Sequence, residues 1–501
     1  MQRLEITAFR KISKMIFGFV VLAVSVTLNA QQVDFSKMES LKPRSIGPAN
    51  MSGRVTSIDV VRTQPDVIYA GSASGGLWKS ESGGIAWEPI FDNELPLSIG
   101  AVAVSQKNPD VVWVGTGEGN PRNSLTGGYG VYRSLDAGKT WELMGLEKTR
   151  NVHRIIIHPD DPNTVYIGAI GSPWGDHEER GVFKTTDGGE TWKKILYVDK
   201  MTGVGDMVMD PANPNKILVN MWQHRREPWF FTSGGPSSGL YMTLDGGKNW
   251  TKQSAEKNGL PEGDLGRMGL AFATNNPNRV YALIEAKQNA LYRSDDGGFN
   301  WEMINKNRDI GNRPFYYYDI YVDPKNENRV YSIFTNVHRS EDGGKSFENI
   351  IGRNLIHVDN HALYIHPDNP KYMLLGNDGG LAITRDMGKT WQFIENLPLG
   401  QFYHIEVDNE FPYNVYGGLQ DNGTYTGPAY VLTNEGIRND YFLPIGGGDG
   451  FDVVSDPDDS RYGYAMSQQG YVFRYDKVTG RSSYIRPTHE DPKVKLRFNW
   501  N

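Results

Sequence analysis

The side chains available for chemistry in this sequence are carboxylates, amides, histidines and aromatic rings. None of the 501 residues is a cysteine. This excludes a disulfide framework, a thiol nucleophile and a Cys-based zinc or iron–sulfur site. The ten histidines show no His-x-x-x-His on a predicted helix and no His-x-His pair; His357, His361 and His366 fall in one predicted blade, where alternation along a strand would separate them. No glycine-rich stretch carries the lysine of a phosphate-binding loop. The sequence therefore predicts no metal and no cofactor.

Polar and aromatic residues recur at the ends of short apolar segments that we expect to be strands. Aromatic faces stack on apolar surfaces, and carboxylates and amides bond hydroxyl or amide groups. Such residues suit a polysaccharide or an extended peptide. The expected ligand-binding residues are Arg54, Glu118, Asn120, His153, Trp174, Trp222, Gln223, Tyr317, Asp319, His361, Asp378, Gln420, Asp421 and Asn422.

The elements that must position these residues are set by an internal repeat. An octet of the form Ser/Thr-x-Asp-x-Gly-x-Thr-Trp returns along the chain, with a degenerate first copy that has lost its Asp. Such periodic self-similarity is typical of solenoids and propellers. The copies occupy residues 80–87, 134–141, 185–192, 243–250, 294–301, 340–347 and 384–391.

Each octet is predicted to be a hairpin turn. Its Asp can accept backbone N–H bonds across the turn, its Gly can take a positive φ, and its closing ring can pack on the neighbouring repeat. We therefore expect these carboxylates to be structural and not catalytic. They are Asp136, Asp187, Asp245, Asp296, Asp342 and Asp386.

A second signature, an Asn-Pro or Asp-Pro turn followed by an apolar strand, lies between the octets, as at 108–115 and 161–168. Each unit then has four short antiparallel strands. Seven such units predict an all-β fold, a β-propeller of four-stranded antiparallel blades. Predicted first strands begin near Gly53, Gly100, Val152, Gly205, Gly266, Tyr317, Asn360, Phe402 and Gly450.

The last two of these units have no octet. We interpret the change near residue 400 as a domain boundary, with a seven-bladed propeller over 31–400 and the start of a second propeller over 401–501. Two blades cannot close a ring, so the second propeller is expected to be truncated. The alternative is one large ring of about ten blades.

The first thirty residues read as a signal peptide. Basic residues precede an apolar run over 15–26, and the segment ends on Ala30. We expect a protein that is secreted, or periplasmic in the cell envelope, with no membrane span in the mature chain. The net charge of −7, without a Lys/Arg cluster, argues against nucleic acid as a partner. The sequence carries no signal of an oligomeric state.

The octets resemble the Asp-box (BNR) repeat. Together with the Asn-Pro turns they resemble secreted bacterial propellers, the sortilin-type N-terminal domains and the xyloglucanase family of glycoside hydrolases. The xyloglucanase resemblance implies two propellers with a sugar cleft between them and two catalytic Asp residues. Ala73 stands where the first of these carboxylates is expected, and an alanine cannot transfer a proton. Asp449, in a Gly-Gly-Gly-Asp-Gly run, is the other catalytic candidate.

These observations lead to one leading function and two alternatives. The leading function is binding of an extracellular polysaccharide or peptide on the loop face and in the cleft between the rings. The first alternative is a glycoside hydrolase that acts on a β-glucan-type polysaccharide through a carboxylate pair. The second is a sortilin-like peptide receptor or scaffold.

Overall fold

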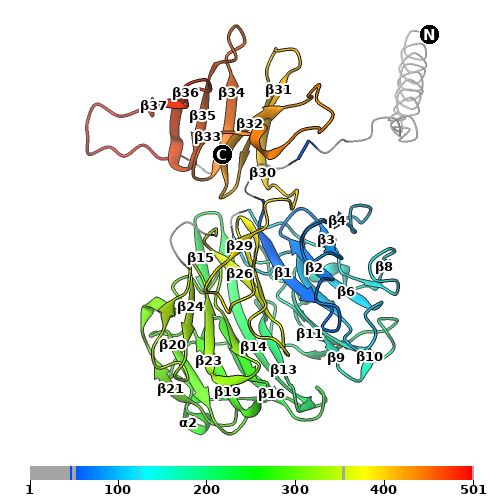
Figure 1. The fold of residues 1–501 in the computed structure, drawn as a ribbon. Coiled ribbons are helices and arrows are strands. Elements are labelled where there is room, and N and C mark those ends of the chain that lie inside the picture. The colour runs from blue at the N-terminus through cyan, green and yellow to red at the C-terminus, as the bar shows by residue number, and fades with distance from the viewer. Residues whose placement is uncertain (1–45, 48–51, 123, 352–355, 499–501) are drawn as a thin grey trace, which may run out of the picture. The chain divides into compact units, whose positions relative to one another are not determined.

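The computed structural model describes residues 46–47, 52–122, 124–351 and 356–498 (Figure 1). The predicted signal peptide over 1–30 lies outside the described residues. The chain divides into two compact units, Met1–Ile46 and Gly47–Asn501, and the account below concerns the second. No helix in the described ranges is long and apolar enough to cross a bilayer.

The described residues form nine antiparallel sheets, here called blades 1 to 9 in chain order, each built from consecutive strands (Figure 1). The strands of blades 1 to 4 are β1 (Val55–Val60), β2 (Ile68–Ser72), β3 (Leu77–Ser80), β4 (Glu88–Pro89); β5 (Ile99–Val104), β6 (Val112–Thr116), β7 (Val131–Ser134), β8 (Glu142–Leu143); β9 (Val152–His158), β10 (Asp161–Ala169), β11 (Gly181–Thr185), β12 (Lys193–Leu196); and β13 (Thr202–Asp210), β14 (Asn213–Glu227), β15 (Phe230–Ser233), β16 (Gly239–Thr243), β17 (Thr251–Lys252).

The strands of blades 5 to 9 follow the same order. They are β18 (Met268–Ala273), β19 (Asn276–Ile284), β20 (Ala290–Ser294), β21 (Glu302–Asn305); β22 (Asp319–Asp323), β23 (Asn326–Ile333), β24 (Val337–Ser340), β25 (Glu348–Asn349); β26 (Asn360–Ile365), β27 (Met373–Asn377), β28 (Gly380–Thr384), β29 (Gln392–Phe393); β30 (Phe402–Val407), β31 (Asn414–Leu419), β32 (Gly423–Pro428), β33 (Leu443–Gly446); and β34 (Gly450–Ser455), β35 (Tyr462–Ser467), β36 (Tyr471–Asp476), β37 (Arg481–Tyr484).

Helix is confined to single turns in the described residues. One is the α-helix α2 (Ala255–Asn258), which Ser254 caps by accepting the N–H of Lys257. The others are 3-10 turns, Glu147–Thr149, Arg308–Ile310, Asn439–Tyr441 and Gln468–Gly470. The fold class predicted from the repeat is therefore confirmed, and the predicted first strands begin within a few residues of the observed ones.

Each octet forms the same turn at the end of its third strand. In blade 2, the Ser134 hydroxyl donates to Asp136 Oδ1 (2.8 Å), and this oxygen accepts the Thr140 N–H (2.9 Å). The contacts with Thr140 and Ser134 outweigh burial and lower the pKa of Asp136 to about 2. In the degenerate copy, Ser82 Oγ accepts the Ala86 N–H instead (2.9 Å), so a hydroxyl replaces the missing carboxylate.

The octet turn and the Asn-Pro turn lie at the same end of a blade. The Ala137 N–H donates to the Asp110 carbonyl (2.9 Å), and the Gly188 N–H donates to the Asn163 carbonyl (3.0 Å). Ala137 has a φ of 59°, in the left-handed region where most other octets have glycine. Because strands alternate in direction, the starts of first strands and the ends of second strands meet at the opposite end, here called the loop face.

Octet rings hold neighbouring blades together. Trp192 of blade 3 packs at 87° on Trp113 of blade 2, with 6.0 Å between ring centroids, and its Nε1 donates to the Met144 carbonyl of blade 2 (2.6 Å). Trp141 makes the same contacts one blade earlier, with Phe91 and the Ile90 carbonyl. Burying such rings against the preceding blade adds to the stability that the apolar cores between blades supply.

The first seven blades close into a ring. One apolar core contains Val55 and Ile68 of blade 1 together with Leu374 and Ile383 of blade 7, and Trp87 of the degenerate octet packs against it. The Ser52 N–H donates to the Gly379 carbonyl across the same interface (2.8 Å). The alternative of one ring of about ten blades is therefore wrong, because blade 1 packs on blade 7.

Blades 8 and 9 form their own pair. Tyr416 of blade 8 shares an apolar core with Val453 and Phe473 of blade 9. The first strand of blade 8 is largely exposed, including the side chains of Ile405 and Val407. The domain boundary near residue 400 and the truncation of a second propeller stay predictions.

Blade 4 departs from the four-stranded pattern. Its second strand, β14, runs on beyond the blade and pairs with β15 from His224–Ser233 to Glu227–Phe230. This β14–β15 hairpin rises from the loop face, and the sequence analysis did not predict it.

We expect Trp301→Ala to lower the free energy of unfolding by about 3–5 kcal/mol. The ring of Trp301 is only 6% exposed, and its Nε1 donates to Gln253 Oε1 of the preceding blade (2.7 Å). The control is Trp229→Ala, which removes a ring that is 77% exposed and should change stability by less than about 0.5 kcal/mol. Urea denaturation followed by circular dichroism measures both, and equal losses would contradict this role.

Candidate functional site

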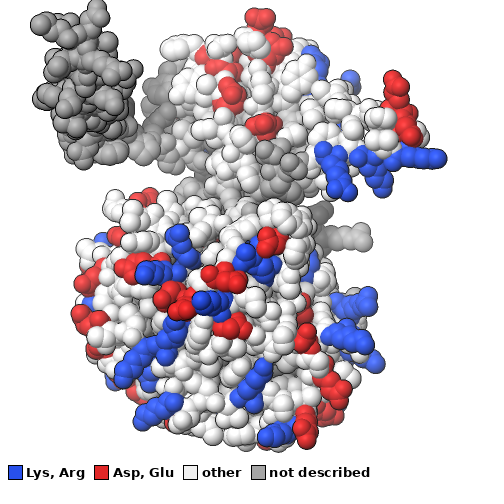
Figure 2. Space-filling view, turned by 180° about the vertical axis from the view of Figure 1, so that it is seen from behind, with Lys and Arg blue, Asp and Glu red and all other residues white. Residues whose placement is uncertain are grey.

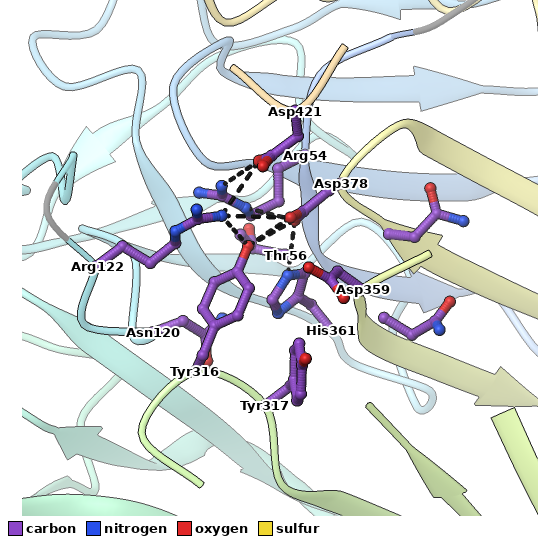
Figure 3. A network of polar contacts seen from close by, with 12 residues as sticks. Arg54, Thr56, Asn120, Arg122, Tyr316, Tyr317, Asp359, His361, Asp378 and Asp421 are labelled. Carbon is purple, nitrogen blue, oxygen red and sulfur yellow. Dashed lines mark hydrogen bonds and ion pairs between the residues drawn. The ribbon is translucent and has the colours of Figure 1, made fainter. Parts of the chain in front are cut away.

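A buried arginine at the loop face binds three carboxylates. Arg54 directly precedes β1 and is 2% exposed. Its Nε donates to Asp378 Oδ1 (2.7 Å), Nη1 to Glu118 Oε1 (3.1 Å) and Nη2 to Asp421 Oδ2 (3.1 Å) (Figure 3). The three carboxylates follow the second strands of blades 7, 2 and 8, so one guanidinium joins four blades.

A second layer completes this cluster. Arg122 Nη1 lies 3.1 Å from Asp421 Oδ2 and donates to the Tyr316 hydroxyl (2.6 Å), which in turn donates to Asp378 Oδ2 (2.6 Å) (Figure 3). His361 Nε2 lies 2.8 Å from Asp378 Oδ1. Burial alone would raise the pKa of Asp378, but Arg54, with His361 and Arg122, lowers it well below its ordinary value. Asp378 is therefore a fixed negative charge.

Two residues of this cluster have strained backbone. Asp421 has a φ of 63° and Asp359 a φ of 62°. The left-handed region costs a residue with a Cβ about 1 kcal/mol or more. Such strain persists where the surroundings determine the conformation, and it is concentrated at functional sites. The Asp359 carbonyl accepts the Asp378 N–H (3.0 Å), so the strained residue helps to place the central carboxylate.

Asp449 lies beside this cluster. Its Oδ1 accepts the Asp421 N–H (2.9 Å), and its own N–H donates to Gln468 Oε1 (2.8 Å). Burial and the neighbouring Asp421 carboxylate raise the pKa of Asp449 to about 6. The two carboxyl groups thus have different surroundings. Asp421 is bound by two arginines, whereas Asp449 can hold a proton in weakly acidic solution.

A cavity of about 400 Å³ opens next to Asp421. Its glycine-rich wall leaves room, because a Cβ at Gly447 would meet no atom within 4 Å. Its lining residues are His357, Asp421, Asn422, Gly423, Tyr425, Pro444, Ile445, Gly446, Gly447 and Gly448. We call this cavity the glycine pocket.

Two further ionic groups fill the centre of the ring. Arg154 of β9 donates to Asp206 of β13 (2.7 Å) and to Asp319 of β22 (2.5 Å). Arg154, Asp206 and Asp319 line a second cavity of about 370 Å³, together with other residues of strands β13, β18 and β22. Arg267 Nη2 lies 3.0 Å from His153 Nε2 and donates to Asn120 Oδ1 (3.2 Å).

Burial, with Arg154 and Arg267 beside it, lowers the pKa of His153 well below its ordinary value. The imidazole is therefore neutral and suited to accept from Arg267. Among the described residues, no group of three or more His, Cys, Asp or Glu side chains is arranged to hold a metal ion.

The expected ligand-binding residues fall into three places in the structure. The Arg54 cluster contains Glu118, His361, Asp378 and Asp421, with Gln420 and Asn422 beside it. The ring centre contains Asn120, His153 and Asp319. Tyr317 packs against Tyr316 and His361 at the edge of the Arg54 cluster, with ring centroids 5.0 and 6.0 Å apart (Figure 3). Trp174 lies on the blade 3 loop, and Gln223 lies in β14.

Trp222 has no exposed surface and stacks on His224 at 4.5 Å, so the structure makes it a core residue and not a ligand contact. Trp174 is exposed on the blade 3 loop, and the Tyr317 hydroxyl bonds Thr335 (2.6 Å). Ala73 is buried, and its N–H donates to the Arg54 carbonyl (3.0 Å). The position expected to carry a first catalytic carboxylate thus holds a methyl group next to the Arg54 backbone.

Sequence reasoning missed Arg122 and Tyr316. Arg122 follows the second strand of blade 2, four residues after Glu118, and that position was a usable signal. Tyr316 is one of three consecutive tyrosines, 316–318, before the first strand of blade 6. Nothing in the run itself distinguishes the one whose hydroxyl reaches Asp378.

The closed ring and the polar cluster at its loop face define a seven-bladed β-propeller. The chain belongs to the Sortilin-Vps10 family, described as sortilin, neurotensin receptor 3, whose profile matches residues 129–289 and 289–403, more than half of the chain. The resemblance to sortilin-type domains is confirmed by this match.

Curated relatives include xyloglucanases. Xyloglucanase Xgh74A of Acetivibrio thermocellus is 26% identical over 205 residues, which cover 35% of this chain and 23% of the relative. A xyloglucanase of Hypocrea jecorina is 25% identical over 248 residues, or 42% of this chain and 26% of the relative. The chain thus matches only about a quarter of the length of these enzymes.

Among the solved structures that align with this chain, PorZ supports the fold. PorZ, a bacterial surface component of the type-IX secretion system of Porphyromonas gingivalis, aligns with a TM-score of 0.50 at 12% identity over 89% of this chain and 54% of that one. The GH74 enzyme of Niastella koreensis aligns with a TM-score of 0.39 at 16% identity, over 88% and 80% of the two chains.

We expect Arg54→Met to lower the free energy of unfolding by about 3–5 kcal/mol, because it leaves buried carboxylates without their cation. The matched control is Arg438→Met, which breaks an exposed ion pair with Asp440 and should leave the stability nearly unchanged. Chemical denaturation of both variants measures the difference. A stable Arg54→Met protein would show that the carboxylates do not depend on this guanidinium.

Proposed function

We propose that the protein is a saccharide-binding propeller and that the glycine pocket holds the sugar. The single observation that carries the proposal is the placement of this open cavity against Asp421, a carboxylate fixed by Arg54 and Arg122. A fixed acceptor beside open space is what recognition of sugar hydroxyls requires. The partial matches to xyloglucanases support a glucan-type ligand.

The lining supplies both kinds of contact that a sugar needs. Asp421 keeps part of its side chain exposed, and Asn422 Oδ1 is a buried acceptor without a hydrogen-bond partner in the described part of the chain. The ring of Tyr425 and the side chains of Pro444 and Ile445 offer apolar surface. The hydroxyl groups of a sugar can donate to the polar side chains, and the CH faces of its pyranose ring can pack on the apolar ones.

We also propose where the protein acts and how it is divided. The signal peptide predicted over 1–30 directs it out of the cytoplasm, and an extracellular polysaccharide is then its partner. Blades 8 and 9 begin a second propeller after a boundary near residue 400. On this proposal the glycine pocket belongs to the junction, since Asp421 comes from blade 8 and the arginines that hold it come from the ring.

The bulky variant Gly447→Trp tests the pocket. It should weaken binding of a xyloglucan oligosaccharide by about tenfold or more, about 1.4 kcal/mol, because the indole fills the cavity. The control is Gly127→Trp, a second glycine whose added Cβ would meet nothing within 4 Å and which does not line the pocket. Isothermal titration calorimetry measures both, and equal affinities would refute the pocket.

A second candidate function, glycoside hydrolysis, is favoured by Asp449. A carboxyl group with a pKa of about 6 can act as a general acid near neutral pH. Its partner would be a carboxylate of the ring acting as base. The alanine at position 73 argues for binding as the leading function, because the family's ring carboxylate is missing there.

If β-glucans are cleaved, the activity should fall as the pH rises through about 6, because Asp449 donates only in its protonated form. Asp449→Asn should then reduce the release of reducing ends by about a hundredfold or more. Asp452→Asn, in which the exposed ion pair with His404 is lost, is the control and should leave activity unchanged. Hydrolysis that survives Asp449→Asn would remove the catalytic assignment.

A further inference from the structure

Arg226 carries a positive charge that no carboxylate balances in the described part of the chain. It lies near the tip of the β14–β15 hairpin, where its Nη2 donates to the Pro121 carbonyl (3.2 Å). Its Nε is buried and has no hydrogen-bond partner among the described residues. The neighbouring Arg225 is different, because it pairs with both Asp176 and Glu227. An unbalanced guanidinium is unexpected in a chain with a net charge of −7.

The hairpin brings Arg226 next to other cations at the loop face. It reaches from blade 4 to the loops of blades 2 and 3, since the Arg226 N–H also donates to the Pro173 carbonyl (2.9 Å). Besides burial, Arg122 and Arg313 lower the pKa of Arg226, as like charges do. Arg313 is 40% exposed, and its carboxylate partner Asp359 lies 3.7 Å away. We call Arg122, Arg226 and Arg313 the arginine strip.

Aromatic rings separate and orient these cations. The Arg226 guanidinium lies 4.8 Å from the Phe231 centroid and 5.8 Å from that of Phe315. Arg313 lies over Phe315 and Tyr316, at 5.6 and 4.9 Å. Phe231 packs on Phe315 at 5.2 Å, which joins the hairpin to the blade 6 loop. These contacts hold the guanidinium groups in place, so the positive field is preorganised.

Exposed aromatic rings flank the strip. Trp229 and Phe230 form the hairpin tip, with ring centroids 6.4 Å apart, and Trp174 follows Pro173, whose carbonyl binds the Arg226 N–H. All three rings are exposed. Figure 2 shows acidic and basic residues interspersed on the face that it presents.

We propose that the arginine strip is a subsite for the carboxylate of an acidic sugar, a uronate residue of a polysaccharide. A planar guanidinium binds a planar carboxylate through charge-assisted hydrogen bonds, and Arg226 makes no ion pair with a carboxylate in the described part of the chain. The exposed rings of Trp174 and Trp229 offer the flat apolar faces on which pyranose rings pack. An acidic peptide would use the charge but not these faces. The inference rests on the proposed saccharide binding and adds a preference for anionic chains.

The test compares two arginines of the same hairpin in the full chain. Arg226→Gln should weaken binding of an oligogalacturonate by about tenfold or more, the loss expected for one charge-assisted hydrogen bond. Arg225→Gln removes the same charge one residue away and should change that affinity by less than about threefold. Binding by the unchanged protein should weaken as sodium chloride is added. Thermal melting confirms that both variants are folded.

Three probes separate this inference from the proposed function. Xyloglucan oligosaccharide should bind the Arg226→Gln and unchanged proteins equally, which supports a subsite for acidic residues. If xyloglucan binds and oligogalacturonate does not, or if both arginine variants lose equally, the uronate subsite is refuted and the glycine pocket stands. If poly-glutamate binds as well as oligogalacturonate, the sugar class is wrong. If no saccharide binds, both proposals fail.

Discussion

The bond on which the structure most depends is the buried ion pair between Arg54 and Asp378. It spans the interface between blades 1 and 7, where the ring closes. A buried guanidinium is costly unless its charge is fully matched, and here Glu118 and Asp421 supply the remaining partners. The same carboxylates that neutralise the cation are thereby fixed at the loop face. The contacts of Arg54 that help to close the ring therefore also build the polar site.

Around this pair, the sequence repeats a simple device. Each octet turns the chain with a hydroxyl and a carboxylate and then presents a ring to the preceding blade. The octet contacts join only neighbouring blades and lie at the end opposite the loop face. The length and sequence of the loops at the loop face can therefore vary. Blade 4 uses that freedom for the β14–β15 hairpin, and blade 2 uses it for the loop that carries Glu118 and Arg122. The repeated turns thus lie at one end of the blades, and the loops that differ from blade to blade lie at the other.

This division also explains what the sequence could predict. The octets and Asn-Pro turns are local signals, so strand order, blade number and the loop-face position of Asp378 and Asp421 could all be read from residue types. Contacts between distant loops could not. Which of three consecutive tyrosines reaches Asp378, and whether Trp222 faces a ligand or the core, depends on side-chain direction after closure. The hairpin was missed because its first strand, His224–Glu227, is a run of polar and charged residues without the apolar pattern that marks the other strands, although Pro228 follows it.

Every blade of the ring is built from one continuous stretch of chain, so no strand is exchanged between blades 1 and 7. The closing interface consists of side chains from residues more than three hundred positions apart, such as Ser52, whose hydroxyl donates to the Leu397 carbonyl. A nascent chain can therefore assemble six blade interfaces in order of synthesis while the seventh waits for the last blade. Contacts of such large sequence separation are slow to form. Trp87 packs against the core that blades 1 and 7 share, so its packing has to wait until blade 7 has been made.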